Sequence, residues 1–409
     1  MANMNLAVLF GSRTCEHDVS IISAVQLMDA AEEAGYQVTP VYIARDGAWY
    51  TGQALRDISV YRTFDPKDVR FTRVALDVTA NAGDLWHWPP RRAGLLFGRI
   101  PEPICHIDVA VPVFHGLHGE DGTVQGLLEL ANIPYTSAGV LGCAVGMDKI
   151  AMKQLFRGAG FPVLPGEWFG RDTWMNEREH VLDRIEEKLE YPLFVKPANL
   201  GSSIGISRAT DRKSLADAID VAVSFDRRVI VEKGVKKPRE VNCAALGYGA
   251  DVIASVCEMP LTGEEFLTYH EKYLKKPGAK GGASKGMQSL SRIVPAPISA
   301  EMTRRIQTLA CEIFKTLDCK GSVRIDFMID EESGELYVNE ANIIPGSLAF
   351  YLWQENGIKY PELVDKMVEF ALRAHADKNH SVFAYDSTIL ESVQSGAKGA
   401  KGTKGGVKR

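Results

Sequence analysis

The order of apolar and polar stretches predicts a parallel α/β unit at the start of the chain. Residues 5–12 form an apolar run, residues 14–35 carry apolar side chains at helical spacing, and residues 36–44 form a second apolar run. A strand, a helix and a strand in this order build a parallel sheet, whose ligands bind at the carboxyl ends of the strands. The loop that follows residue 12 is therefore the first candidate ligand site.

The same alternation continues along the chain. Residues 46–104 are less regular, and we interpret them as an insertion into the first domain. Residues 107–116 predict a buried strand, and a helix and a short strand at residues 134–139 follow it. A helix that begins near Asp148 opens a second domain, and a mixed sheet occupies the chain from Val229 onward. The predicted N-terminal, central and C-terminal domains are residues 1–146, 147–231 and 232–380.

The remaining residues, 381–409, form a basic tail. Its end, SGAKGAKGTKGGVKR, is low in complexity and carries five positive charges and no acidic residue. A segment of this composition cannot bury enough apolar surface to fold. We expect the tail to be disordered.

A predicted hairpin at residues 324–347, RIDFMIDEESGELYVNEANIIPGS, carries polar side chains on one face. Side chains alternate between the two faces of a strand. We place Asp330 opposite Leu336 across the EESG turn, and Asp326 then lies opposite Glu340. Like charges at opposed positions destabilise a sheet unless another charge compensates them.

Two explanations of these carboxylates remain open. In one, the hairpin is an exposed polar sheet face that is neutralised by Arg324, which lies opposite Asn342 in the same register. In the other, Asp326, Glu340 and Asn342 supply oxygen ligands to Mg²⁺, which proteins hold with one or two carboxylates together with substrate phosphates. A phosphate-binding loop in the same chain favours the second explanation.

The segment PLFVKPANLGSSIGIS, residues 192–207, is a candidate for that loop. An apolar strand ends at Lys196, and Gly201, Ser202 and Ser203 follow it. Glycine lets backbone N–H groups approach an anion, serine adds donors, and lysine adds a positive charge. The GxxxxGK[ST] order of a P-loop is missing. A flexible loop beside a solvated lysine explains the pattern equally well, and both interpretations stay open.

A third candidate segment is residues 228–247. A strand ends at Glu232 and Lys233, and another begins near Glu240. Exposed backbone at such a crossover can bind an adenine edge, and a carboxylate can bind ribose hydroxyls. A solvated linker is the alternative explanation of the charges.

A fourth segment, FHGLHGEDGT at residues 114–123, is rich in histidine, glycine and acidic residues. His115 and Glu120 could orient a substrate or each other. The two histidines lie on a glycine loop with no helix to fix them, which argues against a zinc site.

Composition narrows the class of protein. The chain has 409 residues, enough for two or three domains, and 45% of them are hydrophobic. A formal net charge of −5 gives no basic excess, so nucleic acid is not an expected partner. Seven cysteines without metal-type spacing fit a reducing compartment. No window reaches the ~18 apolar residues of a membrane span. We therefore expect a soluble intracellular protein.

Together these motifs resemble the D-alanine–D-alanine ligases of the ATP-grasp fold. The segments HGLHGEDGTVQGLLELANIPYTSAG, KPANLGSSIGIS and GSVRIDFMID…LYVNEANIIPGS carry the resemblance, which runs in order from about Asn5 to about Ala376 without residues 46–104. It implies an α/β protein, α+β in part, of three domains, with ATP between the central and C-terminal domains. It also implies a cytoplasmic, usually homodimeric enzyme of peptidoglycan synthesis that joins two amino acids through an acyl phosphate.

The resemblance assigns roles to individual residues. ATP would be bound by Lys149, Lys196, Gly201, Ser203, Glu232, Lys233, Val235, Glu240, Phe266 and Lys272. Two Mg²⁺ or Mn²⁺ ions would be bound by Asp326, Glu340 and Asn342. Catalytic roles would fall to Glu16, Ser202, Tyr273, Arg324 and Gly346. Amino-acid substrates would be bound by His115, Glu120, Ser347, Tyr351 and Leu352.

Within these sets, the resemblance implies distinct tasks. Glu16 would bind the ammonium group of the first amino acid, helped by His115, while Ser202 and Tyr273 close a loop over the site. Arg324 and the N–H of residue 346 would stabilise the oxyanion that forms as the second amine attacks. Tyr273 resembles the residue of enzymes that accept D-alanine as the second substrate.

The chain departs from the family pattern after PGS. The family has a serine–leucine pair there whose serine helps to bind the second carboxylate, and this chain has SLAFYLW, with Tyr351 at the serine position. One hypothesis is therefore a D-alanine–D-alanine ligase, and a second is the same chemistry with another second amino acid. A nucleotide-binding regulator on a ligase scaffold is a third hypothesis, and the retained metal and lysine positions argue against it.

Overall fold

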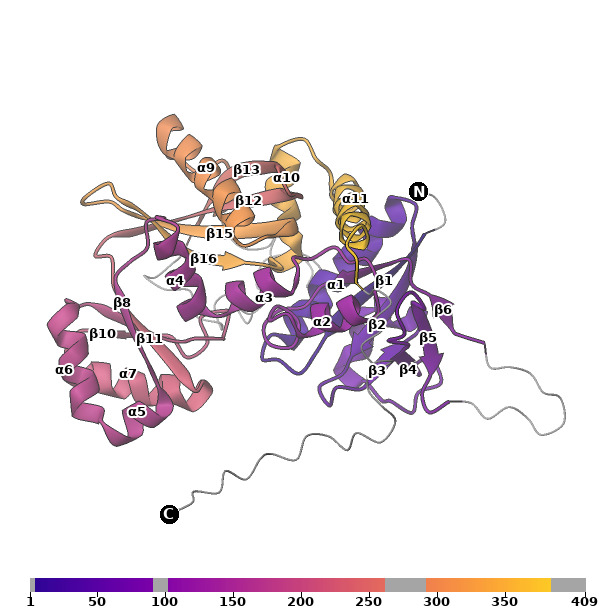
Figure 1. Ribbon diagram of the computed structural model, residues 1–409, viewed down its shortest axis with the longest axis horizontal. Coiled ribbons are helices and arrows are strands. Elements are labelled where there is room, and N and C mark those ends of the chain that lie inside the picture. The colour runs from indigo at the N-terminus through magenta and orange to yellow at the C-terminus, as the bar shows by residue number, and fades with distance from the viewer. Residues whose placement is uncertain (1–3, 91–101, 262–291, 384–409) are drawn as a thin grey trace, which may run out of the picture.

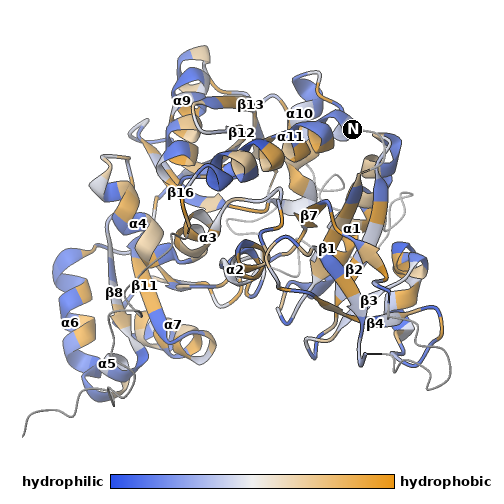
Figure 2. Cartoon of the chain, turned by 45° about the vertical axis from the view of Figure 1, so that its right-hand side comes forward, coloured by the Kyte–Doolittle hydropathy of each residue, from blue (hydrophilic) through white to orange (hydrophobic). Residues whose placement is uncertain are grey.

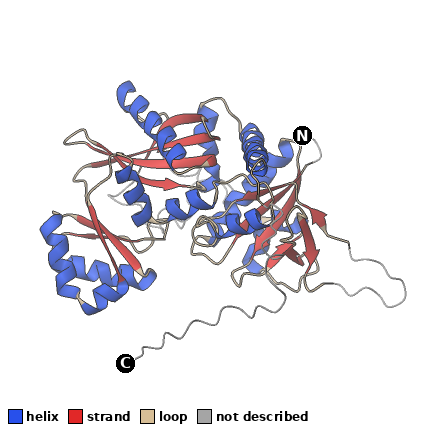
Figure 3. Cartoon of the chain, viewed as in Figure 1, coloured by secondary structure: helices blue, strands red, loops and turns tan. Residues whose placement is uncertain are grey.

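The computed structural model describes residues 4–90, 102–261 and 292–383. Within them, three sheets of seven, four and five strands form three lobes, each with its own helices (Figure 1). Each of the three lobes combines strands with helices (Figure 3). The fold is mixed α/β, as the sequence predicts.

The first lobe begins with the predicted parallel unit. Strand β1 (Asn5–Gly11) pairs in parallel with β2 (Gln37–Ile43), and helix α1 (His17–Glu33) connects them. Strand β7 (Val109–Pro112) pairs in parallel with the other edge of β1. Apolar side chains of β1 and β2 are buried on both faces of the sheet, as expected for strands covered by helices. Helix α2 (Thr123–Leu130) follows β7.

Residues 46–104, which we interpret as an insertion, extend the first sheet in their described part. Their strands pair antiparallel and give the sheet order β6-β5-β4-β3-β2-β1-β7. The elements within the segment are β3 (Trp49–Thr51), η1 (Gln53–Arg56), η2 (Ile58–Thr63), β4 (Thr72–Leu76) and β5 (Asp84–His87), and β6 (Cys105–His106) follows directly after it. The short strand predicted at residues 134–139 is wrong, because only an isolated bridge joins Tyr135 to Ala110.

The second lobe is built on the four-stranded sheet β10-β9-β11-β8. Helices α6 and α7 pack on one face through a core that includes Ile185, Ile219 and Val231. The outer side of α6 is hydrophilic (Figure 2). The elements are α3 (Val140–Met147) and α4 (Lys149–Gly158), which lead into the lobe, then β8 (Gly166–Gly170), α5 (Arg171–Asn176), α6 (Arg178–Lys188), β9 (Leu193–Pro197), β10 (Ser207–Ala209), α7 (Arg212–Phe225) and β11 (Arg228–Lys233).

The third lobe is built on the five-stranded sheet β14-β13-β12-β15-β16. Helix α9 packs on one face, where Phe314 joins a core with Val241 and Ile325. The elements are β12 (Pro238–Tyr248), β13 (Asp251–Pro260), β14 (Arg292–Ile293), α9 (Ala300–Thr316), β15 (Lys320–Asp330), β16 (Leu336–Asn342), η4 (Gly346–Ala349), α10 (Phe350–Glu355) and α11 (Tyr360–Asn379).

The hairpin of β15 and β16 confirms the predicted opposition of Asp326 to Glu340. It also confirms that Arg324 lies opposite Asn342. The pairing of Asp330 with Leu336 is wrong.

Asp330 belongs to the turn instead, since its N–H donates to the Glu335 carbonyl at 2.9 Å and Leu336 pairs with Ile329. A β-bulge at Asn339 adds one residue to β16 and brings the two acids back into opposition.

Candidate active site

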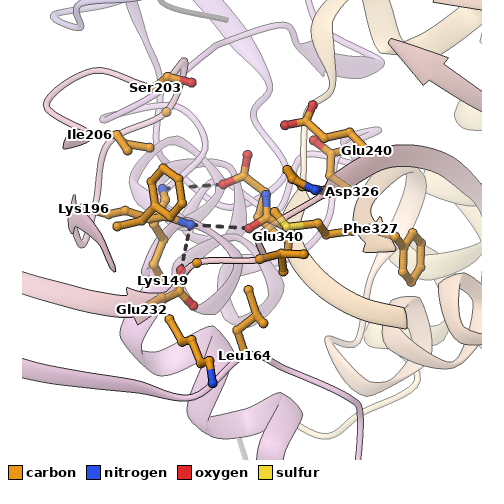
Figure 4. A pocket seen from close by; sticks show the side chains of 18 of the residues that line it. Lys149, Leu164, Lys196, Ser203, Ile206, Glu232, Glu240, Asp326, Phe327 and Glu340 are labelled. Atoms are coloured by element: carbon orange, nitrogen blue, oxygen red, sulfur yellow. Dashed lines mark hydrogen bonds and ion pairs between the residues drawn. The ribbon is translucent and has the colours of Figure 1, made fainter. Parts of the chain in front are cut away.

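A cleft lies between the four-stranded and five-stranded sheets (Figure 4). Strands β9 and β11 form one wall, and β12, β15 and β16 form the other. The structure brings together here most of the residues that the sequence assigns to ATP and metal. Those that line the cleft are Lys149, Lys196, Gly201, Ser203, Glu232, Lys233, Val235, Glu240, Asp326 and Glu340. Ser202, which the resemblance assigns to catalysis, lines it as well.

One part of the cleft is apolar. Leu164, Val235 and Met328 are buried together and contribute to its lining, and Phe194 lies on the wall formed by β9. A planar apolar group such as a purine suits this surface, since binding sites combine apolar walls with a few polar groups. Glu240 lies in the same lining and supplies a carboxylate.

A buried ion-pair triad lies at the wall formed by β9 and β11. Glu232 lies 3.1 Å from Lys153 Nζ and 2.7 Å from Lys196 Nζ, and all three side chains are buried. Burial alone would raise the pKa of Glu232, but the two ammonium groups outweigh it and lower the pKa to about 2. The triad carries two positive charges and one negative charge, so its excess charge favours a phosphate nearby. Sequence reasoning missed Lys153, although its spacing of four residues from Lys149 places both on one helix face.

We expect Lys153→Met to weaken ATP binding. The triad becomes neutral, so the KM for ATP should rise about tenfold. Stability should fall by about 3–5 kcal/mol, because breaking a buried ion pair leaves a charge poorly compensated. Steady-state kinetics and urea unfolding measure both effects. Lys188→Met, which removes an exposed lysine paired with Glu167 at 2.9 Å, is the matched control. An unchanged KM in Lys153→Met would contradict this role.

The polar face of the hairpin forms the other end of the cleft. Arg324 donates to both carboxylate oxygens of Asp326, at 2.6 and 2.8 Å, and Asn342 Nδ2 donates to the same carboxylate at 2.9 Å. Lys149 Nζ lies 3.8 Å from Glu340. Burial raises the pKa of Asp326, Arg324 opposes this effect, and Glu340 adds to it.

This donor set fits Mg²⁺. Two partly buried carboxylates repel each other, and an amide lies beside them, so a hard cation would find oxygen ligands and relieve the repulsion. No group of three or more His, Cys, Asp or Glu side chains suited to a metal occurs among the described residues. A metal at Asp326 and Glu340 would therefore need further oxygen ligands, such as substrate phosphates.

The glycine–serine loop connects the cleft to the first lobe. Ser202 Oγ donates to Glu16 Oε1, and Lys149 Nζ donates to the Leu200 carbonyl at 2.5 Å. Ser202 and Ser203 have left-handed φ angles of 50° and 60°, which cost L-residues roughly 1–2 kcal/mol each. A Cβ on Gly201 would lie 2.8 Å from Glu16 Oε2. The loop therefore packs directly against the carboxylate of Glu16.

His115 and Glu120 lie beside the segment that follows the hairpin. Glu120 accepts hydrogen bonds from the N–H groups of Gly116 at 2.7 Å and Ile344 at 3.1 Å. Burial, with Glu16 as the next cause, raises the pKa of Glu120 to about 8. Burial lowers the pKa of His115 to about 4, so the imidazole is neutral at pH 7.

We expect stability to depend on pH through Glu120. The folded protein keeps the proton up to about pH 8, while the unfolded chain releases it near pH 4.5. Stability should therefore fall as pH rises between these values, by a few kcal/mol. Urea unfolding of the protein without substrates at pH 5 and pH 8 measures this fall in stability. The Glu120→Gln variant should show a smaller fall, because glutamine does not titrate. The same pH dependence in both proteins would contradict the shifted pKa.

The residues after Gly346 are buried. Ser347, Tyr351 and Leu352 are exposed by 1%, 7% and 0%. Tyr351 donates to Glu258 at 3.0 Å.

Arg292 covers the Tyr351 ring at 3.8 Å and pairs with Glu258 at 3.0 Å. Burial, with Glu258 as the next cause, raises the pKa of Tyr351 to about 12. Sequence reasoning missed Glu258 and Arg292, and no motif in the sequence points to them.

Three residues that the sequence assigns to the site, Phe266, Lys272 and Tyr273, lie outside the described residues. Most of the predicted disordered tail, residues 384–409, also lies outside them. No helix in the described part of the chain has both the length and the apolar character that crossing a bilayer requires.

Two sequence-family models match the chain. The one described as "D-ala D-ala ligase N-terminus" matches residues 5–138, and the one described as "D-ala D-ala ligase C-terminus" matches residues 155–369. Among curated relatives, the D-alanine–D-alanine ligase of Thermosipho africanus is 35% identical over 95% of this chain and 98% of its own length. That of Acetivibrio thermocellus is 39% identical over 90% of this chain and 96% of its own length.

Solved structures give the same pattern. The D-alanine–D-alanine ligase from Coxiella burnetii superposes with a TM-score of 0.73 at 27% identity and covers 93% of this chain and 97% of its own. The VanG D-Ala:D-Ser ligase from Enterococcus faecalis superposes with a TM-score of 0.75 at 30% identity and covers 90% of this chain and 99% of its own. The similarity therefore spans all three lobes.

Proposed function

The chain belongs to the D-alanine–D-alanine ligase family, and from this premise we propose how its residues divide the work of ligation. It is an ATP-dependent ligase of the ATP-grasp fold that joins two D-alanines, a reaction of peptidoglycan synthesis. The observation that carries the division of roles is the opposition of Asp326 to Glu340 at one end of a lysine-lined cleft, with Arg324 bound to Asp326.

ATP would lie along the cleft between the second and third lobes. Its base would occupy the apolar part beside Leu164 and Met328, with its ribose near Glu240. Its phosphates would extend toward Lys149 and Lys196. The adenine-binding role of Glu232 would then belong to its backbone, because its carboxylate is held by two lysines.

Mg²⁺, when bound, would neutralise charge on the phosphates of ATP. Asp326, Glu340 and Asn342 would hold two such ions. Two observations support this assignment: the three side chains share one face of the hairpin, and Lys149, which would bind a phosphate, lies 3.8 Å from Glu340.

The first chemical step would activate the first D-alanine. Glu16 would bind its ammonium group, while Ser202 holds the Glu16 carboxylate in place. An oxygen of the substrate carboxylate would attack the γ-phosphorus of ATP, and the bond to ADP would break with its electron pair leaving on ADP. The product is an acyl phosphate, which carries a good leaving group.

The second step would form the peptide bond. The uncharged amine of the second D-alanine would attack the acyl carbon, and negative charge would develop on the carbonyl oxygen. Arg324 and the N–H of Gly346 would stabilise this oxyanion, as preorganised donors do in other acyl transfers. Phosphate would leave with the electron pair of the C–O bond, and the nitrogen would lose a proton.

We also propose that the protein works as a homodimer in the cytoplasm. The seven cysteines are free thiols, which fits a reducing compartment. Gel filtration with light scattering tests the homodimer. A monomer that is fully active would contradict it.

A second candidate function uses the same chemistry with another second amino acid. Tyr351 stands where the family has a substrate-binding serine, and its hydroxyl is bound to Glu258. The panel that separates the candidates measures ADP release with D-alanine alone and with D-alanine paired with each of a set of D- and L-amino acids. We expect full turnover with D-alanine alone. Turnover only with a mixed pair would establish the second candidate.

A further inference from the structure

The backbone turns left-handed for three residues after Gly346. Ser347, Leu348 and Ala349 have φ angles of 49°, 53° and 53°, and none of them is glycine. All three are buried. L-residues avoid this region, and such strain persists where the surroundings hold it, most often at functional sites. The contacts that hold this turn are therefore informative.

Helix α1 of the first lobe holds the turn. The Ser347 N–H donates to Ser23 Oγ at 3.1 Å, and Ser347 Oγ donates to Gln26 Oε1 at 2.7 Å. Ser23 and Gln26 are three residues apart, so they lie on the same face of the helix. His115 Nε2 lies 3.0 Å from the same Ser23 hydroxyl. Ser23 thus connects the turn to His115, which lies in the segment that follows β7.

Peptide groups before and after Gly346 are held by the first lobe. The Ile344 N–H, two residues before Gly346, donates to Glu120, and the Ser347 N–H, directly after it, donates to Ser23. Between these two held groups the ring of Pro345, at φ −65°, fixes one of the backbone angles, so the Gly346 N–H has little freedom to turn. The direction of the Gly346 N–H is therefore set by contacts with the first lobe together with this proline.

We infer that Ser23 and Gln26 are positioning residues for peptide-bond formation, which hold the left-handed turn so that the Gly346 N–H stays aimed at the developing oxyanion. This inference rests on the proposed role of Gly346. Helix α1 begins next to Glu16, which would bind the first ammonium group. One rigid helix would then fix both the amine of the first amino acid and the donor at its carbonyl oxygen.

The test compares two buried serines on the same helix. Ser23→Ala should lower kcat about tenfold and leave both KM values within about twofold. The expected loss is smaller than the roughly 10²–10³-fold fall in kcat that follows removal of an oxyanion donor itself, because the donor stays in place and only its support is weakened. Ser23→Thr keeps a hydroxyl and should recover most of the loss. Gln26→Met should lower kcat in the same way. Ser20→Ala removes hydrogen bonds to Val113 and Gly11 without touching the turn, and should keep kcat within about twofold.

Three results would overturn this inference while leaving the proposed function intact, provided that the wild type is active. They are a kcat of Ser23→Ala equal to that of the wild type, a loss of kcat in Ser20→Ala as large as that in Ser23→Ala, and an effect of Ser23→Ala on KM only. A wild type that forms no dipeptide overturns the proposed function and this inference with it. Unfolding by urea shows whether Ser23→Ala and Ser20→Ala lose similar stability, so a kcat loss confined to Ser23→Ala is not a folding effect.

Discussion

Arg324→Met should lower kcat on the order of 10²–10³-fold, because it removes a charged donor at the oxyanion. It also removes both hydrogen bonds that Asp326 receives from the guanidinium. The Asp326 carboxylate then stays buried without its positive partner, although it still accepts a hydrogen bond from the Asn342 amide. The free energy of unfolding should therefore fall by about 3–5 kcal/mol. Steady-state kinetics and urea unfolding measure the two effects separately.

A second substitution separates catalysis from folding. Asp326→Asn alone loses a proposed metal ligand, so it is the reference for the double variant with Arg324→Met. The double variant removes the unpaired charge, so its stability should recover in part relative to Arg324→Met, while its kcat should stay below that of Asp326→Asn. Arg178→Met is the control, since it removes an arginine that makes two hydrogen bonds to Asp220 on the surface of the second lobe. A kcat of the double variant equal to that of Asp326→Asn would show that Arg324 acts only through Asp326.

Glu340→Gln should lower kcat/KM for ATP by roughly 10²–10³-fold, since a metal that neutralises phosphate charge contributes several kcal/mol. Without substrates, stability should change little, because loss of the repulsion from the opposed Asp326 offsets loss of the ion pair with Lys149 at 3.8 Å. Activity is thus expected to fall without a matching loss of stability. ADP release over a range of Mg²⁺ concentrations and unfolding of the free protein measure them.

The control for this change lies on the same hairpin. Glu331→Gln replaces an exposed acid of the turn, which pairs with Arg239, and activity should remain unchanged. Loss of both stability and activity in Glu340→Gln would indicate that Glu340 supports the sheet instead of a metal.

The hairpin shows how far local rules reach. The two-residue period of a strand is enough to place Asp326 and Glu340 on one face, and this prediction is confirmed. The bulge at Asn339 could not be predicted, because nothing in the sequence marks the residue that a strand leaves unpaired. Asp326 still lies opposite Glu340, as predicted, because the turn and the bulge shift the strand register by one residue in opposite directions.

Other parts of the site depend on contacts between elements that are distant in the sequence. Lys153 becomes part of the site only because strand β11 brings Glu232 against helix α4. The hydrogen bond between Ser347 and Ser23 joins residues 324 positions apart. Apolar periodicity predicts the helices and strands that carry these side chains, but it contains no information about which distant elements meet.

The stoichiometry of the reaction with D-alanine as the only amino acid tests the proposed function most directly. The purified protein is incubated with ATP, Mg²⁺ and D-alanine, ADP is measured enzymatically, and the product is identified by mass spectrometry. We predict one ADP for each D-alanyl-D-alanine formed. Release of ADP without dipeptide, or no ADP release with D-alanine alone, would contradict the proposed reaction.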